Sequence, residues 1–136
     1  MASVSDVDVG ALAPWATETR RVEKPWGYEL IWAVTDIYVG KVLFVKAGHS
    51  LSLQYHEQKD ESWLVQSGRA RIELGAVGEP MVEEVVGEGA AFRYRPGTVH
   101  RITAVEDTTI LEVSTPHLED VVRLQDAYGR QGTSAP

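Results

Sequence analysis

A series of short strand-like segments, separated by turn residues, constrains the fold of this chain more than any other feature. Residues 70–74 alternate strictly between apolar and polar side chains, which is typical of a strand with one buried and one solvated face. Other segments rich in β-branched and aromatic residues follow at intervals of about ten residues. They cover residues 28–32, 38–46, 51–55, 62–66, 81–86, 90–94, 99–105 and 109–114. The pattern predicts an all-β sandwich or closed barrel and excludes folds in which helices alternate with strands.

A single domain fits the chain length of 136 residues, which is enough for one hydrophobic core. We expect residues 22–130 to form this domain. Residues 1–21 show no sustained periodicity and indicate a flexible N-terminal arm, whereas residues 131–136 indicate a frayed tail. Only residues 117–125 favour a helix, a short one near the C-terminus, because their apolar side chains recur with roughly helical spacing.

The amino-acid composition excludes several classes of function. A net charge of −7 and a pI near 5.0 argue against a nucleic-acid or membrane partner, because both attract basic surfaces. The absence of cysteine excludes disulfides, thiolate metal ligands and a cysteine nucleophile. The sequence shows neither a signal peptide nor an apolar run of the roughly 18 residues that a membrane-spanning helix needs, so we expect a cytoplasmic protein.

One stretch, residues 48–68, gathers side chains that can bind a metal ion. Gln54 and His56 are two residues apart, so on a strand they point to the same face. A polar turn follows, and a tight return of the chain would bring Glu61 beside them. His100, after a Pro-Gly turn, can supply a fourth group. Nitrogen and oxygen ligands without a thiolate suit Zn, Fe, Mn, Ni or Co.

The same alternation has a consequence for the outside of the barrel. If Gln54 and His56 point inward, then Leu51, Leu53 and Tyr55 point outward. An apolar row on the outside of a barrel needs a cover, which the N-terminal segment or a second subunit can provide. We therefore expect a homodimer.

Residues 48–68 resemble the first motif of the cupin family, G-x5-H-x-H-x4-E-x6-G, with Gln54 in place of the first histidine. Residues 89–100 resemble the second cupin motif, which ends in Pro-Gly-x-x-His, although Arg95 adds one residue before Pro96 and Ala104 stands where asparagine is common. The resemblance implies a cupin double-stranded β-helix, which is a jelly-roll barrel.

The resemblance also implies a metal site made by Gln54, His56, Glu61 and His100. This set differs from the three-histidine site of iron dioxygenases and is similar to the zinc set of phosphomannose isomerases. Zinc is therefore the favoured ion, with Ni, Mn, Fe and Co as alternatives.

A narrower resemblance involves four separate segments in the same order, residues 23–29, 51–56, 97–101 and 120–130. They are similar to the C-terminal cupin domain of type II mannose-6-phosphate isomerases, which are usually fused to a mannose-1-phosphate guanylyltransferase. No segment resembles the guanylyltransferase part, so guanylyl transfer is not predicted. The resemblance implies a metal-dependent isomerase that interconverts aldose and ketose sugar phosphates.

Two residues of the stretch depart from that family. Lys59 stands where the family has an arginine, and Ser62 stands where it has a histidine before Trp63. Lysine keeps the positive charge but loses the two-pronged grip of a guanidinium on phosphate or carboxylate. Such changes are compatible with a relative acting on another sugar, or with a binding protein.

An aldose–ketose isomerase needs a metal or acid to polarise the sugar oxygens, a base to move a proton between C1 and C2, and a cation to hold the phosphate. Glu61 is the candidate base. Lys59 and Arg101 are candidate cations, although strict alternation after His100 points Arg101 away from the metal face. Further candidate cations are Lys41, Arg93 and Arg95.

Two other functions remain open, because a fold does not determine a function. One is a non-catalytic cupin that binds a sugar or another small molecule. The other is a metal-dependent oxygenase or lyase.

Overall fold

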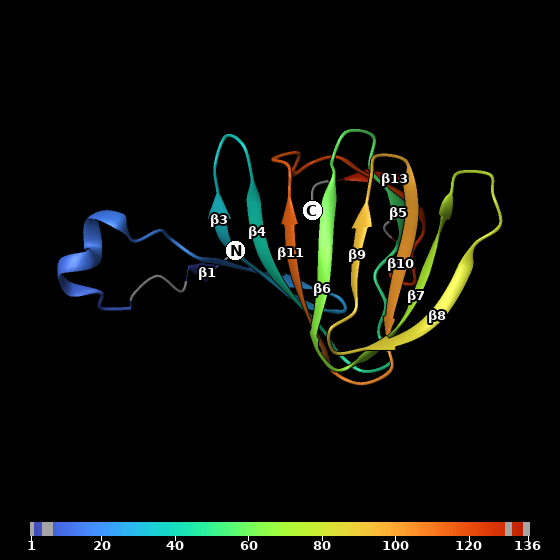
Figure 1. Ribbon diagram of the computed structural model, residues 1–136, viewed down its shortest axis with the longest axis horizontal. Helices are drawn as coiled ribbons and strands as arrows, with labels where there is room; N and C mark the ends of the chain where they lie inside the picture. Colours follow the sequence, from blue (N-terminus) through green and yellow to red (C-terminus); the bar gives the residue numbers. More distant parts are fainter. Residues whose placement is uncertain (1, 4–6, 130–131, 135–136) are drawn as a thin grey trace.

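Two antiparallel β-sheets face one another and form a jelly-roll barrel in the computed structural model of the chain (Figure 1). The structure describes residues 2–3, 7–129 and 132–134. The elements are β1 (Ala2–Ser3), a 3-10 helix η1 (Gly10–Trp15), β2 (Arg20–Lys24), β3 (Gly27–Val34), β4 (Val39–Val45), β5 (Leu53–Tyr55), β6 (Glu61–Ser67), β7 (Arg69–Ala76), β8 (Val82–Gly87), β9 (Ala91–Tyr94), β10 (Thr98–Ala104), β11 (Thr108–Ser114), β12 (Val121–Gln125) and β13 (Gly132–Ser134). The predicted all-β barrel is confirmed.

The chain passes repeatedly from one sheet to the other. One sheet has the strand order β1-β2-β3-β4-β11-β6-β9, and the other has the order β13-β12-β5-β10-β7-β8. The connections from β5 to β6 and from β9 to β10 each cross between the sheets. The first crossing therefore carries the chain from the wall that holds Gln54 to the wall that holds Glu61.

Side chains that alternate inward from both sheets fill the interior. Along several strands these inward positions change from apolar to polar. Ile110 precedes Glu112 on β11, and Ile102 follows His100 on β10, and all four side chains are buried. The interior is thus a hydrophobic core that continues into a buried polar region.

The turn between β6 and β7 depends on Gly68, the last residue of the first motif. Its backbone φ is +97°, in the left-handed region that favours glycine. A Cβ at this position would collide with the backbone oxygen of Asp107 and would lie 2.7 Å from Thr108 Cα. Glycine thus lets the strand end in close contact with the segment before β11.

The predicted helix over residues 117–125 is wrong, because residues 121–125 form strand β12. Val121 and Arg123 alternate inward, and both are buried. β12 pairs with β5 on one side and with β13 on the other. The apolar spacing suits either period, and the β-branched pair Val121 and Val122 favours the strand.

The predicted outward row on β5 holds only in part. Leu51 is 8% exposed and belongs to the hydrophobic core, whereas Leu53 and Tyr55 are half-buried. Regular pairing covers only Leu53–Tyr55, and Ser50 makes an isolated bridge, so the alternation does not extend back to Leu51. The homodimer stays a prediction.

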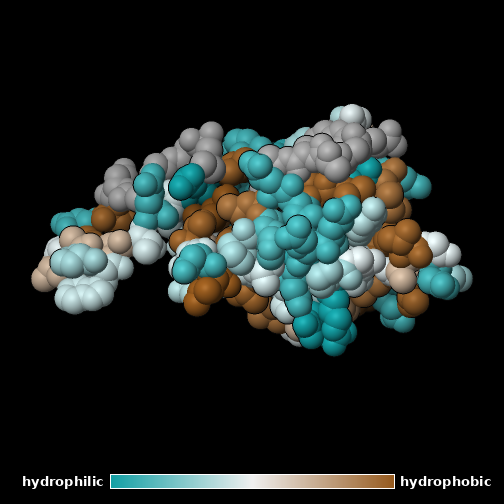
Figure 2. All heavy atoms as spheres, turned by 90° about the horizontal axis from the view of Figure 1, so that it is seen from above, coloured by the Kyte–Doolittle hydropathy of each residue, from teal (hydrophilic) through white to brown (hydrophobic). Residues whose placement is uncertain are grey.

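The N-terminal segment extends beyond one side of the barrel, with η1 at its far end (Figures 1 and 2). Leu12 and Trp15 in η1 are 67% and 78% exposed. β2 pairs with β3, so the sheet begins before residue 22. Of the predicted tail, residues 132–134 form β13, and residues 131, 135 and 136 lie outside the described residues. The described part of the chain has no helix that is long and apolar enough to cross a membrane.

Candidate metal centre

His56, Glu61 and His100 form a compact cluster inside the barrel. Each side chain offers one ligand atom, and these atoms lie within 4.8 Å of one another. His56 Nε2 is 3.3 Å from Glu61 Oε2, and His100 Nε2 is 3.4 Å from Glu61 Oε1. All three residues are at least nine-tenths buried. The tight return of the chain that the sequence indicated does bring these three groups together.

Asp120 holds the turn between β5 and β6 in place. Its carboxylate accepts hydrogen bonds from the backbone N–H groups of Glu57, Gln58 and Lys59, at 3.1, 2.6 and 2.8 Å. Burial alone would raise the pKa of Asp120, but these three donors hold it below its usual value. The backbone carbonyl of Asp120 also accepts a hydrogen bond from His56 Nδ1. One residue therefore orients both the turn and a ring of the cluster.

Hydrogen bonds to backbone carbonyls determine the tautomers of both histidines. A carbonyl oxygen can only accept, so the nitrogen that faces it must carry the proton. His56 Nδ1 faces the carbonyl of Asp120, and His100 Nδ1 faces the carbonyl of Thr98 at 2.9 Å. In the neutral rings each Nε2 then carries a lone pair, which points toward Glu61.

The cluster brings together lone pairs and a negative charge that repel one another, and a bound cation would offset this repulsion. Burial alone would raise the pKa of Glu61, but the charge of Lys59, together with the neighbouring His100 and His56, holds this pKa well below its usual range, so the side chain is a carboxylate. His56 Nε2, His100 Nε2 and Glu61 Oε1 are buried without a hydrogen bond from another described residue, whereas Glu61 Oε2 has the Lys59 ammonium at 2.8 Å. Two lone pairs and a carboxylate repel one another unless a cation lies between them. This donor set fits a zinc-like divalent ion.

Gln54 occupies the same wall of the barrel as His100. The two residues lie directly opposite each other on β5 and β10. Gln54 lines the cavity beside the cluster, and its Oε1 atom accepts a hydrogen bond of 2.7 Å from the Ser52 hydroxyl. An amide oxygen is therefore available near the two imidazoles and the carboxylate.

Lys59 lies inside the barrel rather than on a solvated turn. Its ammonium group is 2.8 Å from Glu61 Oε2 and 3.2 Å from Glu112 Oε2, and its side chain is 6% exposed. Burial would lower the pKa of Lys59, but the two carboxylates outweigh burial and raise it. Glu112 also accepts a 3.0 Å hydrogen bond from Trp63 Nε1. Lys59 is thus a buried cation shared by two carboxylates.

The structure does not bring Arg101 to the cluster. It follows His100 on β10 and so points to the opposite face of the sheet. Its guanidinium contacts Glu73 Oε2 at 2.5 Å and Gln125 at 3.4 Å. Arg93 also lies elsewhere, paired with Asp60 at 2.6 Å on the surface.

A cavity of about 500 Å³, which includes its open mouth, adjoins the cluster. Both sheets contribute to its lining, and its charged members are Lys24, Glu29, Lys41, Lys59, Glu112, Asp120 and Arg123. Of these, the sequence pointed only to Lys41 and Lys59. Glu29 and Glu112 occupy inward positions of β3 and β11, two residues from Ile31 and Ile110, and this alternation was a signal that the sequence offered. Ligand pockets are usually lined mainly by apolar side chains, whereas this cavity has many charged ones.

Aromatic rings support the cluster from one side. The rings of Tyr94 and His100 stack with centroids 4.2 Å apart, and Trp63 meets both rings edge-on. Burial, followed by the nearby Glu61 and Glu112 carboxylates, raises the pKa of Tyr94. Tyr94 therefore stays neutral and serves to pack His100.

Comparisons with known proteins show which family this chain is similar to. The family model "Mannose-6-phosphate isomerase C-terminal" matches residues 15–126. Mannose-1-phosphate guanylyltransferase ManC of Salmonella typhimurium is 36% identical over 117 residues, which is 82% of this chain and 23% of that protein. Xanthan biosynthesis protein XanB of Xanthomonas campestris is 33% identical over 123 residues, 85% of this chain and 25% of that protein. The chain thus spans about a quarter of the length of these relatives.

Solved structures support the cupin fold. The capsular polysaccharide assembling protein CapF from Staphylococcus aureus has a TM-score of 0.72 at 19% identity, covering 83% of this chain and 33% of CapF. Oxalate decarboxylase from Bacillus subtilis has a TM-score of 0.69 at 20% identity, covering 78% of this chain and 30% of the decarboxylase. At such low identity these likenesses show the fold alone.

Proposed function

This chain belongs to the mannose-6-phosphate isomerase C-terminal family, and we propose that it is a metal-dependent isomerase that interconverts the aldose and ketose forms of a sugar phosphate. The observation that carries the proposal is the arrangement of His56, Glu61 and His100, whose lone pairs and carboxylate converge beside a polar cavity. Such a site suits a small substrate rich in oxygen atoms.

The chain's own residues suit a divalent ion, with Zn²⁺ favoured. Gln54, His56, Glu61 and His100 would hold it, through an amide oxygen, two imidazole nitrogens and a carboxylate. When bound, Zn²⁺ would act as a Lewis acid toward the sugar's carbonyl and hydroxyl oxygens.

In the proposed reaction, side chains of the chain carry out the proton transfer. In the forward reaction a base removes the proton from C2 of the aldose and returns a proton to C1, while the hydroxyl proton on O2 passes to O1. The product is an isomer, so no other reactant is required. Glu61 is the proposed base, because a carboxylate has two oxygens and can bind with one while the other accepts a proton.

Lys59 is the proposed positioning residue for this base. Its contacts with Glu61 and Glu112 hold the Glu61 carboxylate in one orientation and offset its negative charge in the barrel interior. Because the Lys59 ammonium is committed to two carboxylates, another cation must hold the phosphate.

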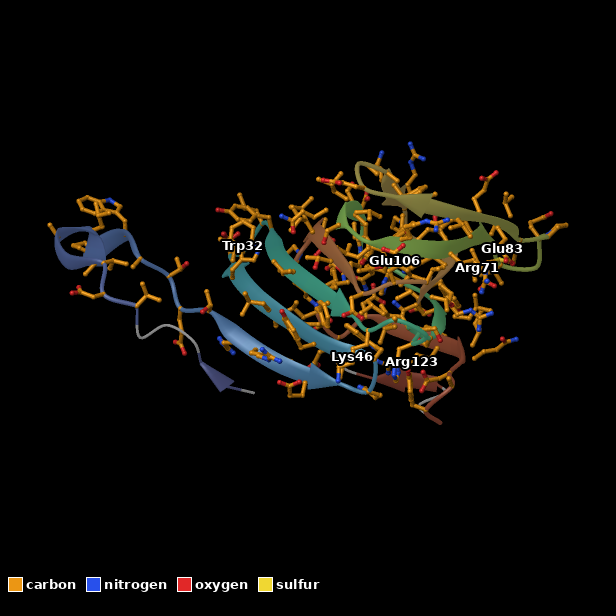
Figure 3. All side chains as sticks on the ribbon, turned by 90° about the horizontal axis from the view of Figure 1, so that it is seen from below. Trp32, Lys46, Arg71, Glu83, Glu106 and Arg123 are labelled. Carbon is orange, nitrogen blue, oxygen red and sulfur yellow. The ribbon has the colours of Figure 1, made fainter. Side chains whose placement is uncertain are left out.

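Conversion of mannose-6-phosphate to fructose-6-phosphate, followed by NMR on the zinc-loaded chain, tests the proposal. We expect turnover, and we expect His56→Ala to abolish it. Arg71→Gln is the matched control, because Arg71 pairs with Glu83 on the exposed surface at 2.9 Å (Figure 3). Equal turnover by His56→Ala and the unmodified chain would contradict the proposal.

A non-catalytic sugar-binding protein is the second candidate, and Lys59 is the observation that favours it. The family arginine is replaced by a lysine that is buried between carboxylates. Binding of a sugar phosphate without exchange of its C2 proton for deuterium would support this alternative over the isomerase.

A further inference from the structure

We propose that Arg123 and Lys24 form an anion-binding site in the cavity and that this site holds the phosphate group of the substrate. The inference rests on the proposed function. It names the cations that would bind the phosphate, a role that the proposed function leaves without a residue. Neither residue stood among the cations predicted from the sequence. Both line the same cavity as His56 and Gln54, from opposite sheets.

The pairing of three neighbouring strands places Arg123. Across the sheet, His100 on β10 lies opposite Gln54 on β5, and Gln54 lies opposite Arg123 on β12. Residues directly opposite one another point to the same face of a sheet, so all three side chains point into the barrel. Two strand spacings, about 10 Å, separate the backbones of His100 and Arg123. This separation suits a ligand whose carbonyl end lies at the metal cluster and whose phosphate lies at Arg123.

Burial makes Arg123 unlike a surface arginine. The residue is only 7% exposed. Lys24, the last residue of β2 in the opposite sheet, is half-buried and lines the same cavity. Two cations from opposite sheets thus border one cavity, and at the buried Arg123 charges attract more strongly than in water.

The two other lysines of the cavity are held by carboxylates. Lys41 lies 3.4 Å from Glu29, and Lys59 lies between Glu61 and Glu112. Moving either lysine to a substrate would leave a buried carboxylate without its cation, which is costly. These contacts argue against Lys41 and Lys59 as the residues that bind the phosphate.

The chemistry of arginine suits this role. A guanidinium has five N–H donors and binds phosphate through two parallel hydrogen bonds, while a phosphate monoester carries a charge of about −1.5 to −2 at neutral pH. Arg123 and Lys24 also interact with other groups of their own chain. Five donors allow Arg123 to keep such a contact and to bind an anion as well.

Calorimetric titration of the zinc-loaded full chain tests the site, with mannose-6-phosphate, unphosphorylated mannose and inorganic phosphate as probes. We expect Arg123→Gln to weaken binding of mannose-6-phosphate by about 10- to 100-fold, the loss typical of a charge-assisted hydrogen bond to phosphate. Arg123→Lys should restore part of the affinity, and binding of mannose should not change. Inorganic phosphate should compete with mannose-6-phosphate in the unmodified chain only.

Lys24→Gln keeps the test decisive if Arg123→Gln fails to fold, because Lys24 lies on another strand and is more exposed. The affinity of the Lys24→Gln variant for mannose-6-phosphate should also fall, and its zinc content should not change. Arg71→Gln is again the surface control.

The outcomes separate this inference from the isomerase. Binding of mannose-6-phosphate that depends on Arg123 and Lys24, without turnover, would support the anion site and contradict the isomerase. Turnover with unchanged affinity in Lys24→Gln and in folded Arg123→Gln would overturn the anion site and leave the isomerase. An unmodified chain that binds neither mannose-6-phosphate nor inorganic phosphate would also overturn the anion site.

Discussion

His56 donates a hydrogen bond from Nδ1 to the backbone carbonyl of Asp120, a residue 64 positions later in the chain. This contact joins the segment before β12 to the turn before β6, and it turns His56 Nε2 toward Glu61. A hydrogen-bonded partner behind a metal-binding histidine determines its tautomer and orientation. The last strands of the barrel thus help to build a site whose side chains come from earlier strands.

We expect Asp120→Ala to destabilise the fold and to weaken metal binding. The variant leaves three backbone N–H groups of the turn without their acceptor, at a cost of about 1–3 kcal/mol in the free energy of unfolding. Metal affinity should fall by about 10- to 100-fold, because the support of His56 is loosened. Urea unfolding and metal titration measure the two effects. Glu119→Ala, at an exposed neighbouring position, is the control; equal effects in both variants would contradict this role of Asp120.

Removal of metal with a chelator should lower the unfolding temperature of the chain. A ligand present at 100 times its dissociation constant stabilises the native state by about 2.7 kcal/mol. For a domain of this size we expect a shift of several degrees, which calorimetry can measure. His100→Ala should show the lower temperature with or without metal, whereas His49→Ala, whose ring pairs with Tyr128 instead, should respond like the unmodified chain. An unmodified chain that is insensitive to the chelator contradicts the metal centre.

Replacement of Lys59 by methionine should be among the most destabilising single changes in the barrel. It leaves the buried Glu61 and Glu112 carboxylates without their shared cation, and loss of one partner of a buried ion pair costs about 3–5 kcal/mol. Denaturant unfolding provides the measurement. The exposed pair of Arg71 and Glu83 offers a matched control, because Arg71→Met should change stability little. A Lys59→Met variant as stable as Arg71→Met would show that Lys59 does not have this role.

Gly68→Ala should destabilise the chain more than Gly78→Ala. Both glycines have positive φ, +97° and +80°, so alanine strains the backbone at either position. At Gly68 the added methyl group also collides with the backbone before β11, whereas at Gly78 nothing lies within 4 Å of it. We expect about 1 kcal/mol for Gly78→Ala and clearly more for Gly68→Ala in urea unfolding. Equal losses would mean that the β6–β7 turn does not need this close approach.

Local patterns in the sequence predicted most of the fold. Strict alternation in residues 70–74 and the β-branched strands elsewhere predicted the sheets, since each side chain's direction follows from its neighbours. The segment over residues 117–125 was mistaken for a helix because its apolar residues suit both periods. Only the pairing of β12 with β5, a contact between distant parts of the chain, determines that residues 121–125 form a strand.

The candidate site was likewise predictable only in part, because its local spacing was visible in the sequence and its contacts between distant strands were not. The spacing of His56 and Glu61 around a polar turn was visible in the sequence, and so was the Pro-Gly turn before His100. The burial of Lys59 was not, because a lysine in a polar turn usually points to solvent. Its partner Glu112 comes from β11, and Arg123 becomes a neighbour of Gln54 only when β12 pairs with β5. Such contacts depend on which strands are adjacent.

The most direct test of the metal centre is anomalous X-ray diffraction at the zinc edge from crystals of the zinc-loaded chain. We predict one strong peak inside the barrel, within about 2.0–2.2 Å of His56 Nε2, His100 Nε2 and a Glu61 oxygen, with Gln54 Oε1 as a further ligand. The peak should be absent from crystals of His56→Ala prepared in the same way. Anomalous signal found only at surface residues, with none between these side chains, would contradict the metal centre.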